Sequence, residues 1–305
     1  MSAAATYETL TEAGCGVLDS RDDGKLLLRG GEAAGLLDGQ LSNDIGALEP
    51  GRGCDSALLT GKGRIVAPVR VLRREDGYLL LTERATLQEL FDRLRTGGLG
   101  WDAELVKQTL ELSRIELLGP GTDEVLTAAG YAPPGEPLHS SSADAVRTPY
   151  GADLLVAAAD ETSARSALAE AGALPASEAL AEIVRAEHGR PRWGYELDET
   201  VMPEETGLVD ELVSFTKGCY VGQETVARLH WKGKPNRFLR KLRLDAPGGQ
   251  GDAITLPDTP DRALGTIGTA VVSPSEGPIA LAMVRREAGP GDTVVVADGI
   301  SATIA

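Results

Sequence analysis

Residues 217–224 read KGCYVGQE, and they lie within a long polar segment that separates two differently patterned parts of the chain. This stretch places the thiol of Cys219 between two glycines and close to Lys217, and the pattern predicts that a short helix begins at Gln223. A neighbouring ammonium group and a helix N-terminus both favour a thiolate over a thiol. Cys219 is therefore the candidate reactive cysteine. The alternative is a small buried hydrophobic residue, as most free cysteines are.

Upstream of this stretch the pattern predicts two related units. Residues 25–29 form a strand-like run that is followed by Gly30-Gly31 and a helical segment over 32–41. The same order of strand, glycine turn and helix returns at 112–118, Gly119-Pro120-Gly121 and 123–129. A weak internal echo of this kind indicates related halves of one domain. We expect one α/β domain over 1–234, with halves at about 1–107 and 108–234.

Downstream of residue 234 the pattern changes to short strand-like runs that Gly- and Pro-rich turns separate. The runs cover 238–244, 264–272, 279–285 and 292–296. Regular strands without helices are typical of a small β-barrel or sandwich. We therefore expect an α+β fold with a second domain of this all-β kind over 235–305.

The charge distribution excludes a generic nucleic-acid or membrane-surface binder. The chain has 305 residues, 30 basic against 46 acidic, and a formal net charge of −16, whereas phosphate contacts need clustered Lys and Arg. One segment differs: residues 217–243 hold eight basic side chains and a single acid, Glu224. This basic strip is either an anion-binding surface or a solvated face that pairs with acidic neighbours.

The three cysteines, Cys15, Cys54 and Cys219, are too widely spaced for a disulfide framework or a local zinc site. The N-terminal residues lack the basic and apolar regions of a signal peptide, and no apolar run is long enough to cross a bilayer. We expect a cytoplasmic monomer. The histidines at 139, 188 and 230 are isolated in sequence, so no metal site is predicted.

The string KGCYVGQE resembles the signature of the YgfZ-type folate-binding proteins, which are relatives of the glycine-cleavage T-protein, an aminomethyltransferase. Eight positions of mixed chemistry rarely recur by chance. Further segments match in the same order and extend the resemblance over nearly the whole chain: QLSND at 40–44, LLTGKGRIV at 58–66, RAEHG at 185–189 and PEE at 203–205.

The resemblance implies T-protein-like α/β units around a central cavity that binds tetrahydrofolate or another reduced folate, with the β-barrel alongside. It places Glu187 where the T-protein has a glutamate that binds the pterin. A carboxylate suits this task because it accepts two parallel N–H bonds from an aminopyrimidine edge. By the same resemblance and the basic strip, the other candidate folate-binding residues are Lys217, Asn43, Asp44, Arg228 and Tyr220, and Cys219 is the functional residue.

One position departs from the T-protein. The aspartate that follows the glycine hairpin there, and is thought to assist folate chemistry, is replaced here by Ala67. Alanine can neither accept a proton nor steady a cation, so efficient aminomethyl transfer is not expected.

Three functions are compatible with these residues. The first is a tetrahydrofolate-binding protein that supports assembly or repair of iron–sulfur enzymes through Cys219, with iron–sulfur client proteins as partners. The second is a folate-dependent aminomethyl or demethylating transferase, so the sequence leaves open whether a reaction is catalysed. The third is a non-catalytic scaffold whose basic strip docks an acidic protein.

Overall fold

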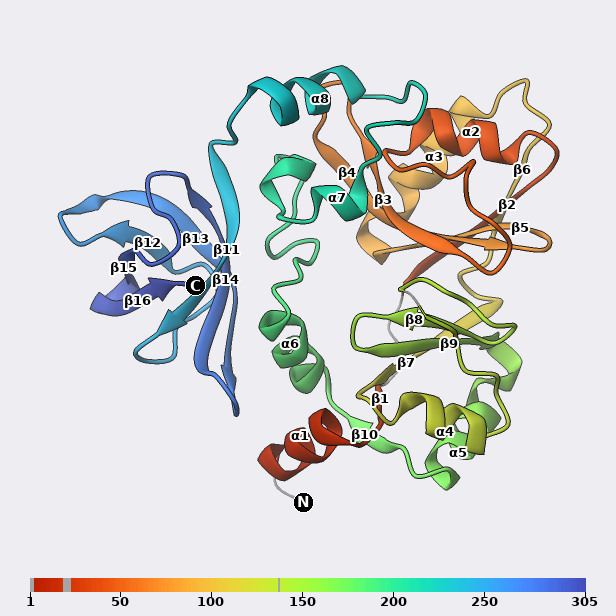
Figure 1. Ribbon diagram of the computed structural model, residues 1–305, viewed down its shortest axis with the longest axis horizontal. Helices are drawn as coiled ribbons and strands as arrows, with labels where there is room; N and C mark the ends of the chain where they lie inside the picture. The colour runs from red at the N-terminus through yellow and green to blue at the C-terminus, as the bar shows by residue number, and fades with distance from the viewer. Residues whose placement is uncertain (1–2, 19–22, 137) are drawn as a thin grey trace. The chain divides into compact units, whose positions relative to one another are not determined.

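The computed structural model describes residues 3–18, 23–136 and 138–305 (Figure 1). Contacts divide the chain into two compact units. The first comprises Met1–Leu59, Val66–Ala181 and Glu211–Val221, and the second comprises Thr60–Ile65, Glu182–Asp210 and Gly222–Ala305. Three segments before residue 234, at 60–65, 182–210 and 222–234, thus group with the barrel, and the expected boundary at 234/235 stays a prediction. No described helix has the length and apolar character needed to cross a bilayer.

The first unit contains two five-stranded sheets. The strands of one sheet follow the order β3-β4-β5-β2-β6, and they are β2 (Gly24–Arg29), β3 (Gly53–Leu59), β4 (Ile65–Arg74), β5 (Gly77–Thr82) and β6 (Glu104–Lys107). Its helices are α2 (Ala33–Gln40) and α3 (Leu87–Gly97), the latter preceded by the short η1 (Arg84–Thr86). The predicted strands and helices of residues 25–94 are all present in this part.

The other sheet of the first unit has the order β10-β1-β7-β9-β8. Its strands are β1 (Gly16–Leu18), β7 (Leu112–Leu118), β8 (Ala145–Thr148), β9 (Gly151–Ala157) and β10 (Leu174–Ala176). The accompanying helices are α1 (Ala3–Glu12), α4 (Thr122–Ala128), η2 (Ala158–Asp160) and α5 (Glu161–Glu170). The structure adds α1, β1, β8 and β10, whose short or mixed sequences gave no clear periodicity.

Part of the strand order repeats between the two sheets, since β4-β5-β2 corresponds to β8-β9-β7. In each sheet a glycine with positive φ joins one of these strands to the following helix, Gly30 (φ 124°) between β2 and α2 and Gly119 (φ 107°) between β7 and α4. A Cβ atom would lie 2.4 Å from a backbone oxygen at Gly30 and 2.3 Å from one at Gly119. Both turns therefore need glycine for conformation and for space.

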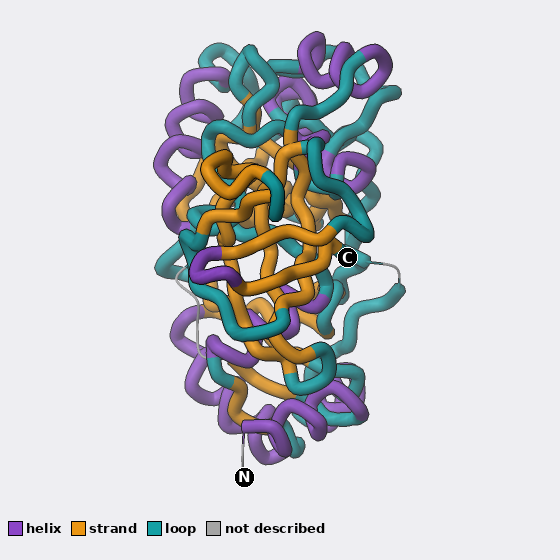
Figure 2. The backbone as a smooth tube through the Cα atoms, turned by 90° about the vertical axis from the view of Figure 1, so that its left-hand side faces the viewer, coloured by secondary structure: helices purple, strands orange, loops and turns teal. Residues whose placement is uncertain are grey.

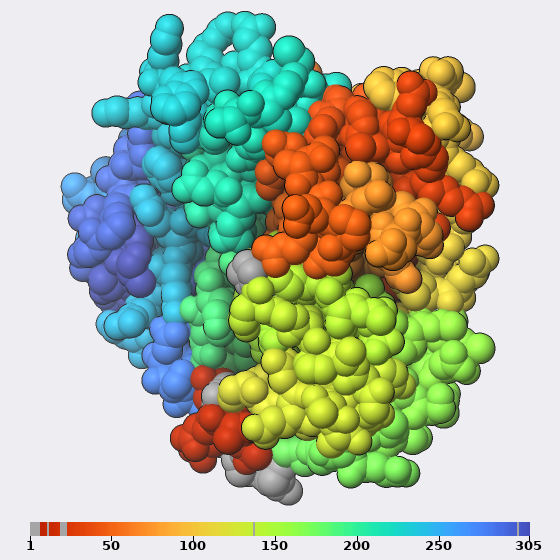
Figure 3. All heavy atoms as spheres, turned by 45° about the vertical axis from the view of Figure 1, so that its right-hand side comes forward, coloured from red at the N-terminus to blue at the C-terminus, as the bar shows by residue number. Residues whose placement is uncertain are grey.

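A buried ionic network and an apolar cluster link the two sheets of the first unit, whose residues adjoin as orange and yellow-green surfaces in Figure 3. Asp153, which is fully buried, bonds Arg70 at 2.9 Å and Arg114 at 3.0 Å. Leu79 and Val146 are buried in one cluster that joins β5 to β8. Because an unpaired buried charge is costly, the network favours keeping these strands together.

The second unit contains the predicted β-barrel, which is confirmed as a closed six-stranded barrel of order β11-β14-β13-β12-β15-β16 (Figure 2). Its strands are β11 (Arg237–Leu244), β12 (Ala253–Leu256), β13 (Thr259–Ser273), β14 (Gly277–Arg285), β15 (Thr293–Val296) and β16 (Ile300–Ile304). The short η4 (Ala297–Gly299) lies before β16. Two strands, β12 and β16, were not predicted, and β16 closes the barrel by pairing with β11.

The remaining helices are α6 (Glu178–Glu187), η3 (Pro203–Glu205), α7 (Val209–Leu212) and α8 (Gln223–Lys232). The end of α6 packs on the barrel: Ala186 is buried with Ile279 and Leu281. The guanidinium of Arg185 also hydrogen-bonds Thr269 of β13. These contacts explain why residues 182–210 group with the barrel.

Candidate functional site

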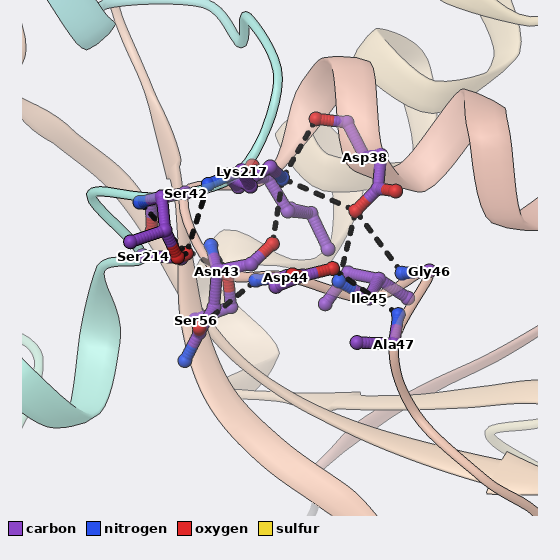
Figure 4. Close-up of polar contacts among 12 residues, drawn as sticks. Asp38, Ser42, Asn43, Asp44, Ile45, Gly46, Ala47, Ser56, Ser214 and Lys217 are labelled. Atoms are coloured by element: carbon purple, nitrogen blue, oxygen red, sulfur yellow. Dashed lines mark hydrogen bonds and ion pairs between the residues drawn. The ribbon is translucent and has the colours of Figure 1, made fainter.

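Residues 211–221, which we call the strap, carry the KGCY portion of the motif across the segment that contains QLSND (Figure 4). The backbone N–H of Ser214 donates to Ser42 O at 3.0 Å, and that of Val221 donates to Gly39 O at 3.3 Å. The Ser42 hydroxyl donates to Leu212 O at 2.6 Å. The strap is therefore attached on both sides of Cys219.

The ammonium group of Lys217 is the principal anchor of the strap. It donates to three backbone oxygens, Asp38 O at 2.8 Å, Leu41 O at 3.0 Å and Asn43 O at 2.6 Å. It also lies 3.2 Å from the Asp38 carboxylate, and only 2% of its side chain is exposed. Burial lowers the pKa of Lys217, and the negative charge of Asp38 partly opposes this shift. The side chain ties two distant segments together.

The predicted folate-binding residues Asn43 and Asp44 have structural partners in the first unit. The Asn43 amide nitrogen donates to Asp55 O and to Glu211 O, both at 2.8 Å. The carboxylate of Asp44 accepts the Ala47 N–H at 3.1 Å. The structure thus brings Lys217, Asn43 and Asp44 together around the strap.

Cys219 is exposed, and so is the preceding Gly218. Its neighbour Tyr220 is buried, and burial raises the pKa of this phenol to about 12. The Tyr220 hydroxyl has no hydrogen-bond partner among the described residues. The strap therefore presents one thiol to solvent between a buried cation and a buried ring.

The other two cysteines differ from Cys219. Burial raises the pKa of Cys15 to about 11 and that of Cys54 to about 12. At neutral pH both remain thiols, which are poor nucleophiles and poor metal ligands. Exposure thus separates Cys219 from the rest.

The last part of the motif meets the glycine hairpin within the second unit. Gly222 precedes α8 with φ 88°, and a Cβ there would lie 2.5 Å from Thr60 O and 3.2 Å from Gly63 Cα. Only glycine fits such a position. Two segments that resemble the T-protein, LLTGKGRIV and KGCYVGQE, thus touch through their glycines.

Glu187, the predicted pterin-binding residue, is the last residue of α6 and is half-buried in the second unit. Its carboxylate accepts hydrogen bonds from the hydroxyls of Ser273 and Ser275. Its backbone oxygen accepts one from Lys241 at 3.0 Å. The carboxylate is therefore held by the barrel rather than left as a mobile surface acid.

The basic strip is largely paired. Arg228 lies on exposed α8 and bonds Glu224 at 2.6 Å, while Lys241 bonds Glu276 at 2.5 Å. Trp231 is 69% exposed at the end of α8. Arg228 is thus a surface residue, and its role as a folate-binding residue stays a prediction.

Each histidine has a local partner. His139 lies 3.2 Å from the Asp55 carboxylate, and His230 lies 2.6 Å from that of Glu204. His188 Nδ1 lies 2.8 Å from Val184 O. Within residues 3–18, 23–136 and 138–305, no group of three His, Cys, Asp or Glu residues has the arrangement of a metal site.

Ala67 is fully buried in the core of the first unit on β4. The side chain at this position therefore offers neither a polar atom nor exposed surface.

Two features were not identified from the sequence. Asp38 supports the strap through Lys217 and also accepts the N–H groups of Ile45 and Gly46. Buried Arg185 bonds the fully buried Glu196 at 3.1 Å, which orders the loop after α6. The sequence did contain a signal for both features: Asp38 lies just before the QLSND segment, and Arg185 begins the RAEHG segment.

Comparison with known proteins gives the relatives of the chain. No protein-family model matches it. The aminomethyltransferase of Rubrobacter xylanophilus is 26% identical over 92% of this chain and 79% of its own length. The tRNA-modifying protein YgfZ of Colwellia psychrerythraea is 25% identical over 78% of this chain and 75% of its own length.

Among solved structures, the glycine cleavage system aminomethyltransferase T from Bartonella henselae has the same fold. It matches with a TM-score of 0.87 and 20% identity, over 99% of this chain and 88% of that protein. The predicted mixed fold with its C-terminal barrel is thus confirmed. Homologous sequence and shared fold together confirm the resemblance of this chain to the YgfZ-type proteins of the glycine-cleavage T-protein superfamily.

Proposed function

We propose that this chain binds a reduced folate and supports iron–sulfur enzymes, with Cys219 as its functional thiol. The observation that carries the proposal is the strap, which fixes an exposed cysteine between two attachment points. The folate part of the proposal is supported by the T-protein-like fold and by the aminomethyltransferase relatives.

The strap suits thiol chemistry because it supplies access and position together. Thiolates are the usual ligands of iron–sulfur clusters and are also the side chains that oxidants attack first. Both reactions need a sulfur atom that solvent can reach, and of the three cysteines only Cys219 is exposed. Lys217 acts here as a positioning residue, since its ammonium group is occupied by Asp38, Leu41 and Asn43.

Glu187 is the proposed pterin anchor in the second unit. Ser273 and Ser275 orient its carboxylate, so little side-chain entropy is lost when an aminopyrimidine edge binds. An aminopyrimidine edge would add a bidentate, charge-assisted pair of hydrogen bonds to this carboxylate.

Transfer of an aminomethyl group is the less favoured function. The relatives include aminomethyltransferases, but the buried methyl group of Ala67 supplies no general acid or base. Turnover of tetrahydrofolate with a methylamine-type donor would favour this second function.

The decisive experiment compares Cys219→Ser with Glu187→Gln. We expect Cys219→Ser to abolish support of iron–sulfur enzyme activity in a deletion strain and to leave calorimetric binding of tetrahydrofolate unchanged. Glu187→Gln should weaken that binding. Cys54→Ser is the matched control, because its thiol is not exposed. Full complementation by Cys219→Ser would refute the role of the thiol, and absence of saturable folate binding would refute the folate role.

A further inference from the structure

A polar cleft of about 810 Å³ lies wholly within the second unit and contains none of the predicted folate-binding residues. The loop at 195–205 forms one wall, and the start of β11, the middle of β13 and the end of β14 form the other. Residues 263–266 of β13 belong to the barrel wall. Gly268 allows this packing, since a Cβ there would lie 2.8 Å from Tyr195 O.

Four arginines line this cleft: Arg64, Arg237, Arg285 and Arg286. Arg237 and Arg285 lie directly opposite each other in the β11–β14 pair. Like charges at opposed positions of a sheet are destabilising. Acidic residues outnumber basic residues in the chain as a whole. This end of the β11–β14 pair nevertheless concentrates positive charge.

The carboxylates that line the cleft already have partners. Glu196 bonds Arg185 at 3.1 Å, Glu205 bonds Arg237 at 3.2 Å, and Glu287 bonds Arg262 at 2.6 Å. The fourth, Asp198, accepts the Thr200 N–H at 2.7 Å. Their negative charge is therefore committed to groups other than Arg64 and Arg286.

The arginines are less well satisfied. Arg237 donates to Thr200 O at 2.8 Å and pairs with Glu205. The side chains of Arg64 and Arg286 are exposed and make neither an ion pair nor a hydrogen bond with any described residue. Arg285 lies near enough to Glu287 to help lower the pKa of that carboxyl. The cleft therefore has guanidinium groups available for a ligand.

We propose that this cleft binds a small polyanion with at least two carboxylate or phosphate groups, held by Arg64, Arg285 and Arg286. The planar guanidinium fork matches both kinds of group through two parallel hydrogen bonds. Bound anionic charge would also offset the repulsion between Arg237 and Arg285. The assignment is independent of the proposed folate and thiol functions.

Calorimetry of the full chain tests this site, with tricarballylate and inorganic pyrophosphate as separate probes at constant ionic strength. We expect saturable one-site binding of at least one probe. The double variant Arg64→Gln/Arg286→Gln should lower that affinity by roughly tenfold or more. Tricarballylate binding alone would identify a carboxylate ligand, and pyrophosphate binding alone would identify a phosphate ligand.

Arg243→Gln is the matched control, because Arg243 is 67% exposed on the same barrel but does not line the cleft. Its affinity should equal that of the unaltered chain within twofold. The proposal is overturned if neither probe binds saturably at millimolar concentration, or if Arg243→Gln weakens binding as much as the double variant does. Equal melting temperatures of the variants would show that folding does not explain a loss.

Discussion

Replacement of Lys217 by Met tests how far one buried cation holds the strap. Methionine keeps the unbranched apolar stem but removes all three N–H donors. The change leaves the oxygens of Asp38, Leu41 and Asn43 without the donor that now lies 2.6–3.0 Å away. It also leaves the Asp38 carboxylate without its cation at 3.2 Å.

The expected cost follows from burial. A buried acceptor that loses its donor costs about 1–3 kcal/mol, and loss of one member of a buried ion pair costs about 3–5 kcal/mol. Asp38 is 33% exposed, so water can solvate part of its charge, and removal of the buried ammonium recovers desolvation energy. We therefore expect a net loss of about 2–4 kcal/mol in the stability of the attached strap.

Hydrogen exchange of backbone amides in residues 211–221 measures this loss directly. Each 1.4 kcal/mol corresponds to about a tenfold change in an equilibrium constant, so protection should fall by roughly 30- to 700-fold. Strap protection in Lys217→Arg should lie between that of the unaltered chain and that of Lys217→Met. A planar guanidinium fork does not converge on three carbonyls as an ammonium group does.

Lys62→Met is the control, because Lys62 is exposed in the glycine hairpin. Exchange in the strap should be unchanged in this variant. If Lys217→Met leaves strap protection and the denaturant midpoint at their original values, the view of Lys217 as the anchor of Cys219 is wrong.

Three further predictions concern other contacts. Iodoacetamide at neutral pH should alkylate Cys219 alone among the three cysteines of the native protein, since the other two have raised pKa values. Mass spectrometry of tryptic peptides measures the labelling, and equal labelling of all three cysteines would contradict the prediction. Gly222→Ala should lower the free energy of unfolding by about 1–3 kcal/mol because φ is 88° and the new methyl group would meet Thr60 O; an unchanged urea midpoint would disprove the clash. Burial of Asp55 acts to raise its pKa, but Arg70 and His139 together outweigh this and hold the pKa well below its usual range. This carboxylate therefore contributes stability above pH 3.8, its unfolded value, that is lost as pH falls through the lower folded pKa. In Asp55→Asn, the free energy of unfolding measured by urea titration should fall less between pH 7 and pH 2. A pH profile identical to that of the unaltered chain would exclude the ion pair as the cause of the fall.

Local patterning was sufficient for most elements of the fold. Strand runs such as 112–118 match β7 residue for residue, and Gly30 and Gly119 lie at the predicted turns. These signals are local because alternation of side chains and positive φ act over a few residues. Strands β12 and β16 were not predicted, and the structure shows them paired with β13 and β11.

The candidate site was only partly predictable. Cys219 was chosen from its glycine and lysine neighbours, and the structure places it on the surface. The resemblance and the basic strip assigned Lys217, Asn43 and Asp44 to folate binding, which stays a prediction, and the structure adds that each of them is bonded to protein groups. A side chain's type and position in the sequence do not say whether protein or ligand satisfies it.

The sequence by itself determined the longer strands and helices, the glycine turns and the choice of Cys219 as the candidate thiol, because these depend on residues close together along the chain. Only the tertiary structure decided what anchors that thiol, since Lys217 and Asp38 are 179 positions apart. The arginine cleft likewise combines residue 64 with residues 285 and 286. Free energies of burial and ion pairing depend on three-dimensional proximity, which local periodicity does not encode.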